Sequence, residues 1–273
     1  LSRNLEVQGR YREAEPFRRS ALEVLQNDKE ASEQLPAAFT ALGFNLTMQG
    51  RLSEGATYGY QALEMLRAAG KDDDLDASQT MSTVGLMLDK QGHFAEAEPF
   101  YRRALAIRSR ILGGADLDTA TSNNNLAAAL SAQGKAEEAA IYFQRAMEVR
   151  QANGTVPTLV AQNALNLASN LARQGKLDDS LPYYQNAIET WTKIFGSNSV
   201  HVAAGYNGLG LNNYRQGRFE EAVQLFRKSR SIRKKALGKY HPDVGESYGN
   251  LGLAYRALGR EKKARALLST ALQ

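Results

Sequence analysis

The chain has 273 residues, of which 43% are hydrophobic and 23% are charged, and its formal net charge is +5. This composition is ordinary for a globular protein, and so small a charge excess does not mark a nucleic-acid-binding protein. The absence of cysteine excludes disulfides, thiolate metal ligands and cysteine nucleophiles within the chain, and the absence of a long apolar run predicts no transmembrane helix. Residues 1–11 show no basic-then-apolar leader pattern, and we expect a cytoplasmic protein.

A Gln-Gly pair recurs along the whole chain and divides it into repeats. The glycines of these pairs, and that of a final Leu-Gly pair, are 41 or 42 residues apart: Gly9, Gly50, Gly92, Gly134, Gly175, Gly217 and Gly259. Each glycine lies between two apolar-periodic segments of helical length, and glycine readily adopts the left-handed conformation that ends a helix. The sequence therefore predicts two antiparallel helices per repeat, A and B, joined at the glycine.

Small residues at a fixed place in helix A predict close packing between neighbouring helices. The position seven residues before the glycine holds only glycine or alanine: Gly43, Gly85, Ala127, Ala168, Gly210 and Gly252. Helix B has a bulky aromatic residue at one position, which we expect to fill the space that the small residues leave: Tyr101, Phe143, Tyr184 and Phe226. The first two copies have Arg18 and Gly59 at this position, so looser packing is expected there.

In chain order, the pattern predicts a partial first repeat and six full repeats. The partial repeat covers 1–28, and the full repeats cover about 35–69, 77–112, 118–152, 159–195, 201–237 and 243–272. Because neither helix can bury its apolar stripe alone, the repeats should stack into one domain over 1–273, each contacting only its neighbours. Asp76, Asp118 and Asp243 are predicted to cap A helices, and Asp76 with Gln79, like Asp243 with Glu246, has capping-box spacing.

The leucine-small pair in helix A, the glycine turn, and the alanine-aromatic-alanine series in helix B resemble the tetratricopeptide repeat (TPR). All seven copies match this pattern. The period of about 42 residues, the linker over 237–244 and the helix A segment over 123–127 are similar to the longer-helix subclass of kinesin light chains and many bacterial regulatory proteins. The resemblance implies an all-α, right-handed superhelical solenoid that acts as a protein-protein interaction scaffold and not as an enzyme.

The resemblance also implies where a partner would bind. Family geometry places helix A on the concave wall, and the positions ten and nine residues before each glycine face the groove. Five asparagines occupy these positions: Asn124, Asn125, Asn166, Asn207 and Asn250. Their amides both donate and accept, so they are candidates to bind the main chain of an extended peptide, or alternatively to pair with one another between repeats. Nearby cations favour an acidic peptide: Lys90, Arg173, Arg215 and Arg256.

Chemistry of other kinds has little support. The histidines, His93, His201 and His241, are far apart and lack metal-ligand spacing, so we expect no metal and no cofactor. No nucleophile elbow or phosphate-binding loop is present. Trp191 is expected in the core. One dense basic run on an outward B helix favours a solvated convex face over nucleic acid, since only Tyr240 interleaves it: Arg227, Lys228, Arg230, Arg233, Lys234, Lys235 and Lys239.

Two hypotheses accompany that of a peptide-binding scaffold. The chain starts within an A helix and ends on an apolar B helix with Leu267, Leu268 and Leu272, so we expect the array or another domain to continue in a longer protein. In the bacterial proteins that the array resembles, such repeats often control a fused effector, for example a caspase-like protease or an ATPase. The partner could then be a domain of the protein's own full-length chain. The remaining hypothesis is nucleic-acid binding through the basic run.

Overall fold

The structure is a computed structural model that describes residues 2–28, 31–154 and 157–271. Apart from one 3-10 turn at Ser32–Gln34, the regular elements of these residues are α-helices. They are α1 (Ser2–Val7), α2 (Tyr11–Asn27), α3 (Leu35–Met48), α4 (Leu52–Ala68), α5 (Leu75–Lys90), α6 (Phe94–Ile111), α7 (Leu117–Ala132), α8 (Ala136–Ala152), α9 (Pro157–Arg173), α10 (Leu177–Phe195), α11 (Val200–Arg215), α12 (Phe219–Leu237), α13 (Pro242–Ala257) and α14 (Glu261–Ala271). The predicted all-α array of helix pairs is confirmed. Leu272 lies outside the described residues.

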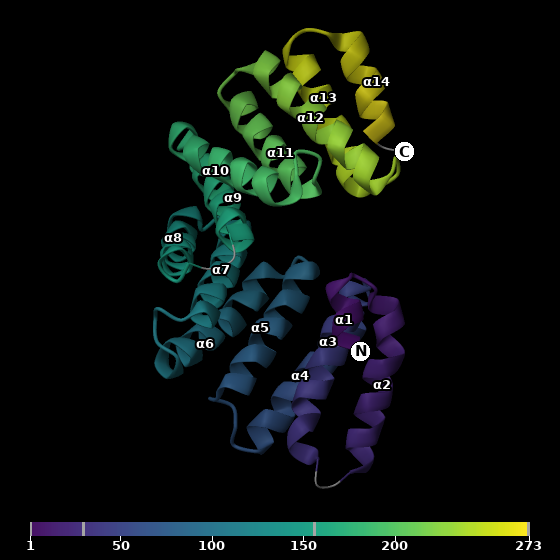
Figure 1. Cartoon of the computed structure of the whole chain (residues 1–273), viewed down its shortest axis with the longest axis vertical. Helices are drawn as coiled ribbons and strands as arrows, with labels where there is room; N and C mark the ends of the chain where they lie inside the picture. The colour runs from purple at the N-terminus through teal and green to yellow at the C-terminus, as the bar shows by residue number, and fades with distance from the viewer. Residues whose placement is uncertain (1, 29–30, 155–156, 272–273) are drawn as a thin grey trace. The chain divides into compact units, whose positions relative to one another are not determined.

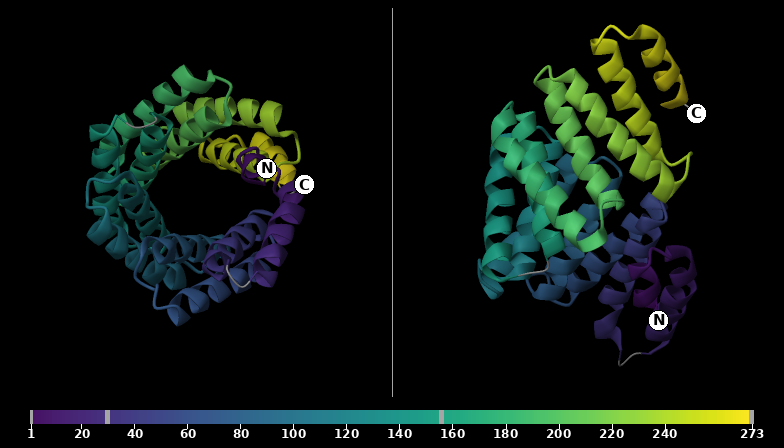
Figure 2. Two further views of the ribbon diagram at one scale, coloured as in Figure 1. Left: turned by 60° about the horizontal axis from the view of Figure 1, so that its bottom comes forward. Right: turned by 45° about the horizontal axis from the view of Figure 1, so that its top comes forward.

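The chain divides into two compact units, one up to Val149 and the other from Arg150 onwards. In the first unit α3 pairs with α4 and α5 with α6, and α3 and α7 also contact α5 (Figure 1). In the second unit α9 pairs with α10, α11 with α12 and α13 with α14, while α11 contacts α9 and α13. Within each unit the pairs stack side by side, as two further directions show (Figure 2). The odd-numbered helices from α3 onwards are the predicted A helices, and the even-numbered ones are the B helices.

The repeat glycines end the A helices as the sequence predicts. Gly92 has a φ of 80°, and the other six repeat glycines have φ between 69° and 85°. The Gly92 N–H donates to Asp89 O, and the His93 N–H donates to Leu88 O, each at 2.9 Å. These two bonds form a Schellman motif, which satisfies carbonyls that the helix end leaves unpaired.

Small residues admit bulky neighbours at the interface between helices A and B, as predicted. A Cβ added to Gly85 would lie 2.7 Å from Cε1 of Tyr101, and one added to Gly210 would lie 2.7 Å from Cε1 of Phe226. Both rings are buried, with 2% and 1% of their surface exposed. Interiors packed this closely leave no room for a methyl group. Trp191 is in the core, as expected, with 1% exposed.

The expectation of loose packing at Gly59 is wrong. A Cβ at Gly59 would lie 2.8 Å from Cγ2 of Val84 and 3.0 Å from Sδ of Met87, both from the next A helix. These longer side chains take the space that an aromatic ring fills in other repeats. Arg18, at the same repeat position, extends to Glu6, and its Nη2 lies 2.5 Å from Oε2 of that carboxylate.

The predicted helix caps are also wrong, by two residues. The residues that accept at the N-termini of α5, α7 and α13 are Asp74, Asp116 and His241. Asp76, Asp118 and Asp243 follow two positions later, inside the first turn, where a carboxylate instead faces the positive end of the helix dipole. The capping boxes are absent for the same reason. Gln79 and Glu246 accept hydrogen bonds from buried arginines, Arg108 and Arg233 respectively.

Candidate functional site

The glutamine of the Gln-Gly pair binds the preceding repeat, a role that the sequence did not reveal. In the first unit, Nε2 of Gln91 donates to the main-chain oxygen of Leu52 at 3.2 Å, and Nε2 of Gln133 donates to that of Phe94 at 3.1 Å. Leu52 and Phe94 are the first residues of α4 and α6. The end of each of these A helices is thus hydrogen-bonded to the start of the preceding B helix.

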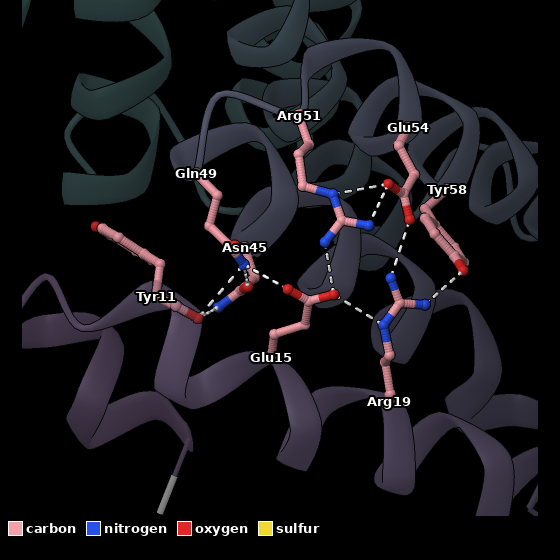
Figure 3. Close-up of polar contacts among 8 residues, drawn as sticks. All are labelled: Tyr11, Glu15, Arg19, Asn45, Gln49, Arg51, Glu54 and Tyr58. Atoms are coloured by element: carbon pink, nitrogen blue, oxygen red, sulfur yellow. Dashed lines mark hydrogen bonds and ion pairs between the residues drawn. The ribbon is translucent and has the colours of Figure 1, made fainter.

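An ion-pair network joins neighbouring B helices in the first unit (Figure 3). Glu15 and Arg19 of α2 face Arg51 and Glu54 at the start of α4. The distance from Arg51 Nη1 to Glu15 Oε1 is 2.7 Å, and that from Arg19 Nη2 to Glu54 Oε1 is 2.9 Å. Arg19 also donates to the hydroxyl of Tyr58. Each carboxylate accepts from two arginines, so the charges of the network balance.

The same network recurs two repeats later. Arg102 bonds Glu98 and Glu138, and Lys135 bonds Glu98, at N···O distances of 2.6–2.8 Å. Burial raises the pKa of Glu98, but hydrogen bonds from Lys135, Arg102 and Gln133 outweigh this effect and hold the pKa at about 2. The glutamate therefore remains charged throughout the physiological pH range. These groups fasten repeats together and are not arranged for acid-base catalysis.

A groove of about 930 Å³ lies in the first unit, along the A helices α3 and α5. Its apolar side chains include Phe44, Met65 and Leu86, and its hydroxyls include Thr40 and Thr80. The Oγ1 atoms of these two threonines lie 3.1 Å apart and connect α3 with α5. A surface that is largely apolar with a few oriented polar groups is typical of a binding pocket.

The positions that the resemblance assigned to the groove meet in this cavity. Thr40, Ala41, Ser82, Thr83 and Asn125 all line it. These residues come from three successive A helices and lie ten or nine residues before their repeat glycines. Ser82 is 7% exposed, and its hydroxyl is without a hydrogen-bond partner among the described residues.

The formal charges around this groove are locally compensated. Arg18 pairs with Glu6, and Nζ of Lys71 lies 3.1 Å from Oε1 of Glu33. Asp76 also lines the cavity. The groove is therefore not strongly charged, and its hydroxyl, amide and apolar groups dominate its chemistry.

The other predicted asparagines have different surroundings. In the second unit, Asn250 donates to Oδ1 of Asn207 at 2.9 Å, and Asn207 donates to Oε1 of Glu246 at 3.2 Å. Here the amides connect α11 with α13, which is the inter-repeat alternative. Asn166 accepts from Gln162 of its own helix. Asn124 is half-buried and follows Asn123 on α7.

The predicted groove cations lie at the ends of A helices. Lys90, Arg173, Arg215 and Arg256 are exposed, and each belongs to the last turn of α5, α9, α11 or α13. A cation there also interacts favourably with the negative end of the helix dipole. Their positions are thus consistent with either a stabilising or a ligand-binding role.

The basic run of α12 differs from its description by sequence in two respects. Arg233 is 7% exposed and donates to Glu246 and Ser247, so it is buried and not part of a solvated face. Tyrosines from A helices also interleave the run. Lys228 lies 5.3 Å from the ring centroid of Tyr206, and Arg230 lies 5.3 Å from that of Tyr248. The sequence concealed these contacts because the tyrosines belong to other helices.

Arg233 has buried counterparts at the same repeat position. Arg108 donates to Oγ of Ser122 at 2.8 Å, and Arg150 donates to Oδ1 of Asn163. Burial lowers the pKa of both arginines, yet a guanidinium remains charged at any physiological pH. These buried cations join a B helix to the following A helix.

Two further searches concern the described residues alone. Within them no group of three or more histidine, aspartate or glutamate side chains is placed to hold a metal ion. None of the helices in the described ranges has the length and apolar character needed to cross a membrane.

Solved structures with the same architecture come from several proteins. BtubC (BKLC) from P. vanneervenii is 27% identical with a TM-score of 0.65, and the match covers 81% of this chain and 89% of that one. A Podosopora anserina structure described as kinesin light chain TPR-like repeats is 21% identical with a TM-score of 0.58, covering 71% and 92%. A Rap protein complexed with Competence and Sporulation Factor is 17% identical with a TM-score of 0.74, covering 99% and 73%. The last two likenesses show the fold alone.

A family model decides the assignment. No curated protein sequence matches the chain. The model described as tetratricopeptide repeat matches residues 34–110, 76–152, 159–235 and 201–273, which together span most of the sequence. The period, the Schellman glycines and the small residues under the aromatic rings are those that the resemblance predicted. The chain belongs to the tetratricopeptide-repeat family, with the longer repeat of kinesin light chains.

Proposed function

We propose that this TPR array, a protein-interaction scaffold, binds an extended peptide in the groove of its first unit. The observation that carries the proposal is the cavity of about 930 Å³ lined by successive A helices. Repeat proteins commonly bind partners along extended surfaces built from the same position of each repeat.

The polar groups of the groove suit a peptide main chain. An extended peptide presents one N–H and one C=O per residue, and these groups must find partners when they are buried. Asn125 supplies an amide that both donates and accepts, while Ser82 supplies a hydroxyl without a protein partner. Together they provide complementary groups for the peptide backbone without selecting its sequence.

The apolar groups would select the side chains of the peptide. Phe44, Met65 and Leu86 line one cavity, and methionine adapts readily to different shapes. We infer that the ligand inserts at least one apolar side chain. A preference for acidic residues would arise outside the groove, at Lys90 on the last turn of α5.

The test combines peptide selection with a substitution that fills the groove. Peptides selected from a random library against the whole chain are measured against Ala37→Trp, because Ala37 is exposed and lines the cavity. Affinity should fall by about tenfold or more, since an indole occupies the space of the ligand. Ala95→Trp is the matched control, because Ala95 is exposed in the first turn of α6 and does not line the cavity. Equal affinity in both variants would refute the proposed site.

A second substitution tests the amide contacts. Replacing Asn125 and Asn166 together by alanine should weaken the selected peptides by about fivefold to tenfold, because each lost hydrogen bond costs about 1 kcal/mol. Asn207→Ala is the comparison, since its amide is already bonded to Glu246 and Asn250. If the double variant retains the affinity of every selected peptide, the asparagines have no role in the groove.

The two other hypotheses stay predictions. Control of a fused effector domain, such as a caspase-like protease or an ATPase, requires a second domain and is tested by the sequence of the full-length protein. Nucleic-acid binding through the basic run of α12 is tested by a gel-shift titration at low and high salt, in which a salt-sensitive retardation is the positive result.

A further inference from the structure

A second groove, of about 590 Å³, lies in the second unit between α12, α13 and α14. Arg227, Arg230 and Lys263 line it together with the aromatic Tyr255, and its apolar lining includes Leu267. The lining contains three cations and no carboxylate. This groove is separate from the peptide groove of the first unit in both position and charge.

The cations converge on one tyrosine ring. The side-chain nitrogen or guanidinium carbon of Arg227, Lys263 and Arg260 lies 5.7, 5.7 and 6.0 Å from the ring centroid of Tyr255. Arg227 also donates a hydrogen bond to the Tyr255 hydroxyl. In the part of the chain that the structure describes, none of these three cations forms an ion pair. Like charges held this close repel one another unless an anion lies between them.

The same repeat position carries ion pairs in the first unit. Arg19, Arg102 and Arg227 each lie ten residues after their repeat glycines. Arg19 lies 2.9 Å from Glu54, and Arg102 lies 2.6 Å from Glu138. The B helices of the first unit therefore supply the carboxylates that their own arginines need.

One carboxylate is replaced by a cation in the second unit. Glu54 and Glu138 lie four residues after a repeat glycine, and Lys263 occupies that position after Gly259. The change from glutamate to lysine reverses the charge at the point that Arg227 faces.

The other carboxylate is replaced by an apolar residue. Glu15 and Glu98 lie six residues after a repeat glycine, where the second unit has Val223 after Gly217. Arg260, one residue after its glycine, retains the cation that is Lys135 in the first unit. Both acids of the network are thus lost, while both of its basic positions are kept.

We propose that this groove binds an acidic segment of a partner protein, whose aspartate or glutamate carboxylates take the places of the two missing glutamates. Arginine is suited to such contacts because its planar fork binds a carboxylate through two parallel hydrogen bonds. Leu251 and Leu267 give the groove an apolar wall for a hydrophobic side chain next to the acids. The site lies on B helices of the second unit, so it stands independently of the proposed peptide groove.

The probe is a fluorescein-labelled peptide of six glutamates, measured by fluorescence anisotropy with the whole chain at low salt. Lys263→Glu restores the acid found in the first unit and should weaken binding at least about fivefold. Lys262→Glu is the matched control, because Lys262 is the exposed neighbour on the same helix and does not line the groove. This control changes the net charge equally and should weaken binding less than about twofold.

Several results would overturn the proposal. Equal losses in the two variants would mean that the peptide senses only net charge. The same conclusion follows if a peptide of six glutamates fails to bind the parent protein. If a single-stranded oligonucleotide of equal charge binds more tightly and also depends on Lys263, the groove recognises nucleic acid and not protein. Ala37→Trp should leave the probe's affinity unchanged, which separates this site from the groove of the first unit.

Discussion

Two glycines of the second unit allow the packing argument to be tested with the same chemical change. Gly210 and Gly249 are interior residues of the A helices α11 and α13. A Cβ at Gly210 would meet the ring of Phe226 at 2.7 and 2.8 Å, whereas one at Gly249 would meet nothing within 4 Å. Gly210→Ala and Gly249→Ala thus add the same methyl group to a tight and to an open site.

The expected magnitudes differ in sign. In a helix interior, glycine to alanine stabilises by about 0.5–1 kcal/mol, and Gly249→Ala should gain this amount in full. At Gly210 the same gain is opposed by overpacking, which costs about 1–3 kcal/mol, because carbon atoms prefer about 3.5–4.0 Å. Gly210→Ala should therefore destabilise the protein by about 1 kcal/mol.

Urea unfolding followed by the fluorescence of Trp191 is a suitable assay. This single tryptophan is buried among Val202, Ala203 and Ile232, so it reports on the second unit even if the array does not unfold in one step. The midpoint should rise for Gly249→Ala and fall for Gly210→Ala. Adding Phe226→Leu to Gly210→Ala should recover at least about 0.5 kcal/mol of coupling energy.

The reasoning is refuted if Gly210→Ala raises the midpoint as much as Gly249→Ala does. The small residues would then reflect something other than the close approach of Phe226. A coupling energy near zero in the double variant would lead to the same conclusion.

Three other outcomes are expected in the first unit. The low pKa of Glu98, about 2 against an ordinary 4.5, means that its contribution to stability is complete above pH 4.5 and is lost as the pH falls towards 2, and Glu98→Gln should flatten that part of the unfolding profile. Burial raises the pKa of Asp89 from 3.8 to about 6, so its charge reduces stability as the pH rises through this window; Asp89→Asn should be more stable than the parent at pH 8 and similar to it at pH 3.5, as thermal unfolding at both pH values will show. Gln91→Ala should cost about 1 kcal/mol in urea unfolding followed by circular dichroism, whereas an unchanged midpoint would mean that its bond to Leu52 contributes nothing.

The sequence predicted the parts of the fold that depend on one residue type at one position. A positive φ requires glycine, and a 2.7 Å approach leaves space for nothing larger, so Gly92 and Gly85 could be interpreted without coordinates. The helix caps were misplaced because the apolar period of an A helix begins after its first turn. Gln91 was noticed only as half of a motif, since its partner is a main-chain oxygen that leaves no mark in the sequence.

The candidate sites were less accessible to prediction. Asn125 was identified from family geometry, but the contributions of Met65 and Leu86 depend on how the helix pairs lean against one another. Asn207 and Asn250 satisfy each other across repeats, which their positions alone could not distinguish from binding a ligand. The missing acid at Val223 had a signal, because aligning the repeats shows glutamate there in other copies.

The glutamine bond between repeats has a consequence for how such a chain can change. Gln49, Gln91 and Gln133 reach main-chain oxygens, which every amino acid possesses, so tyrosine, leucine and phenylalanine all serve as the acceptor residue in the three copies. A joint of this kind places no demand on the neighbouring side chain. Whole modules can therefore be duplicated or exchanged and their surfaces can diverge for new partners, while the mechanical connection between copies persists.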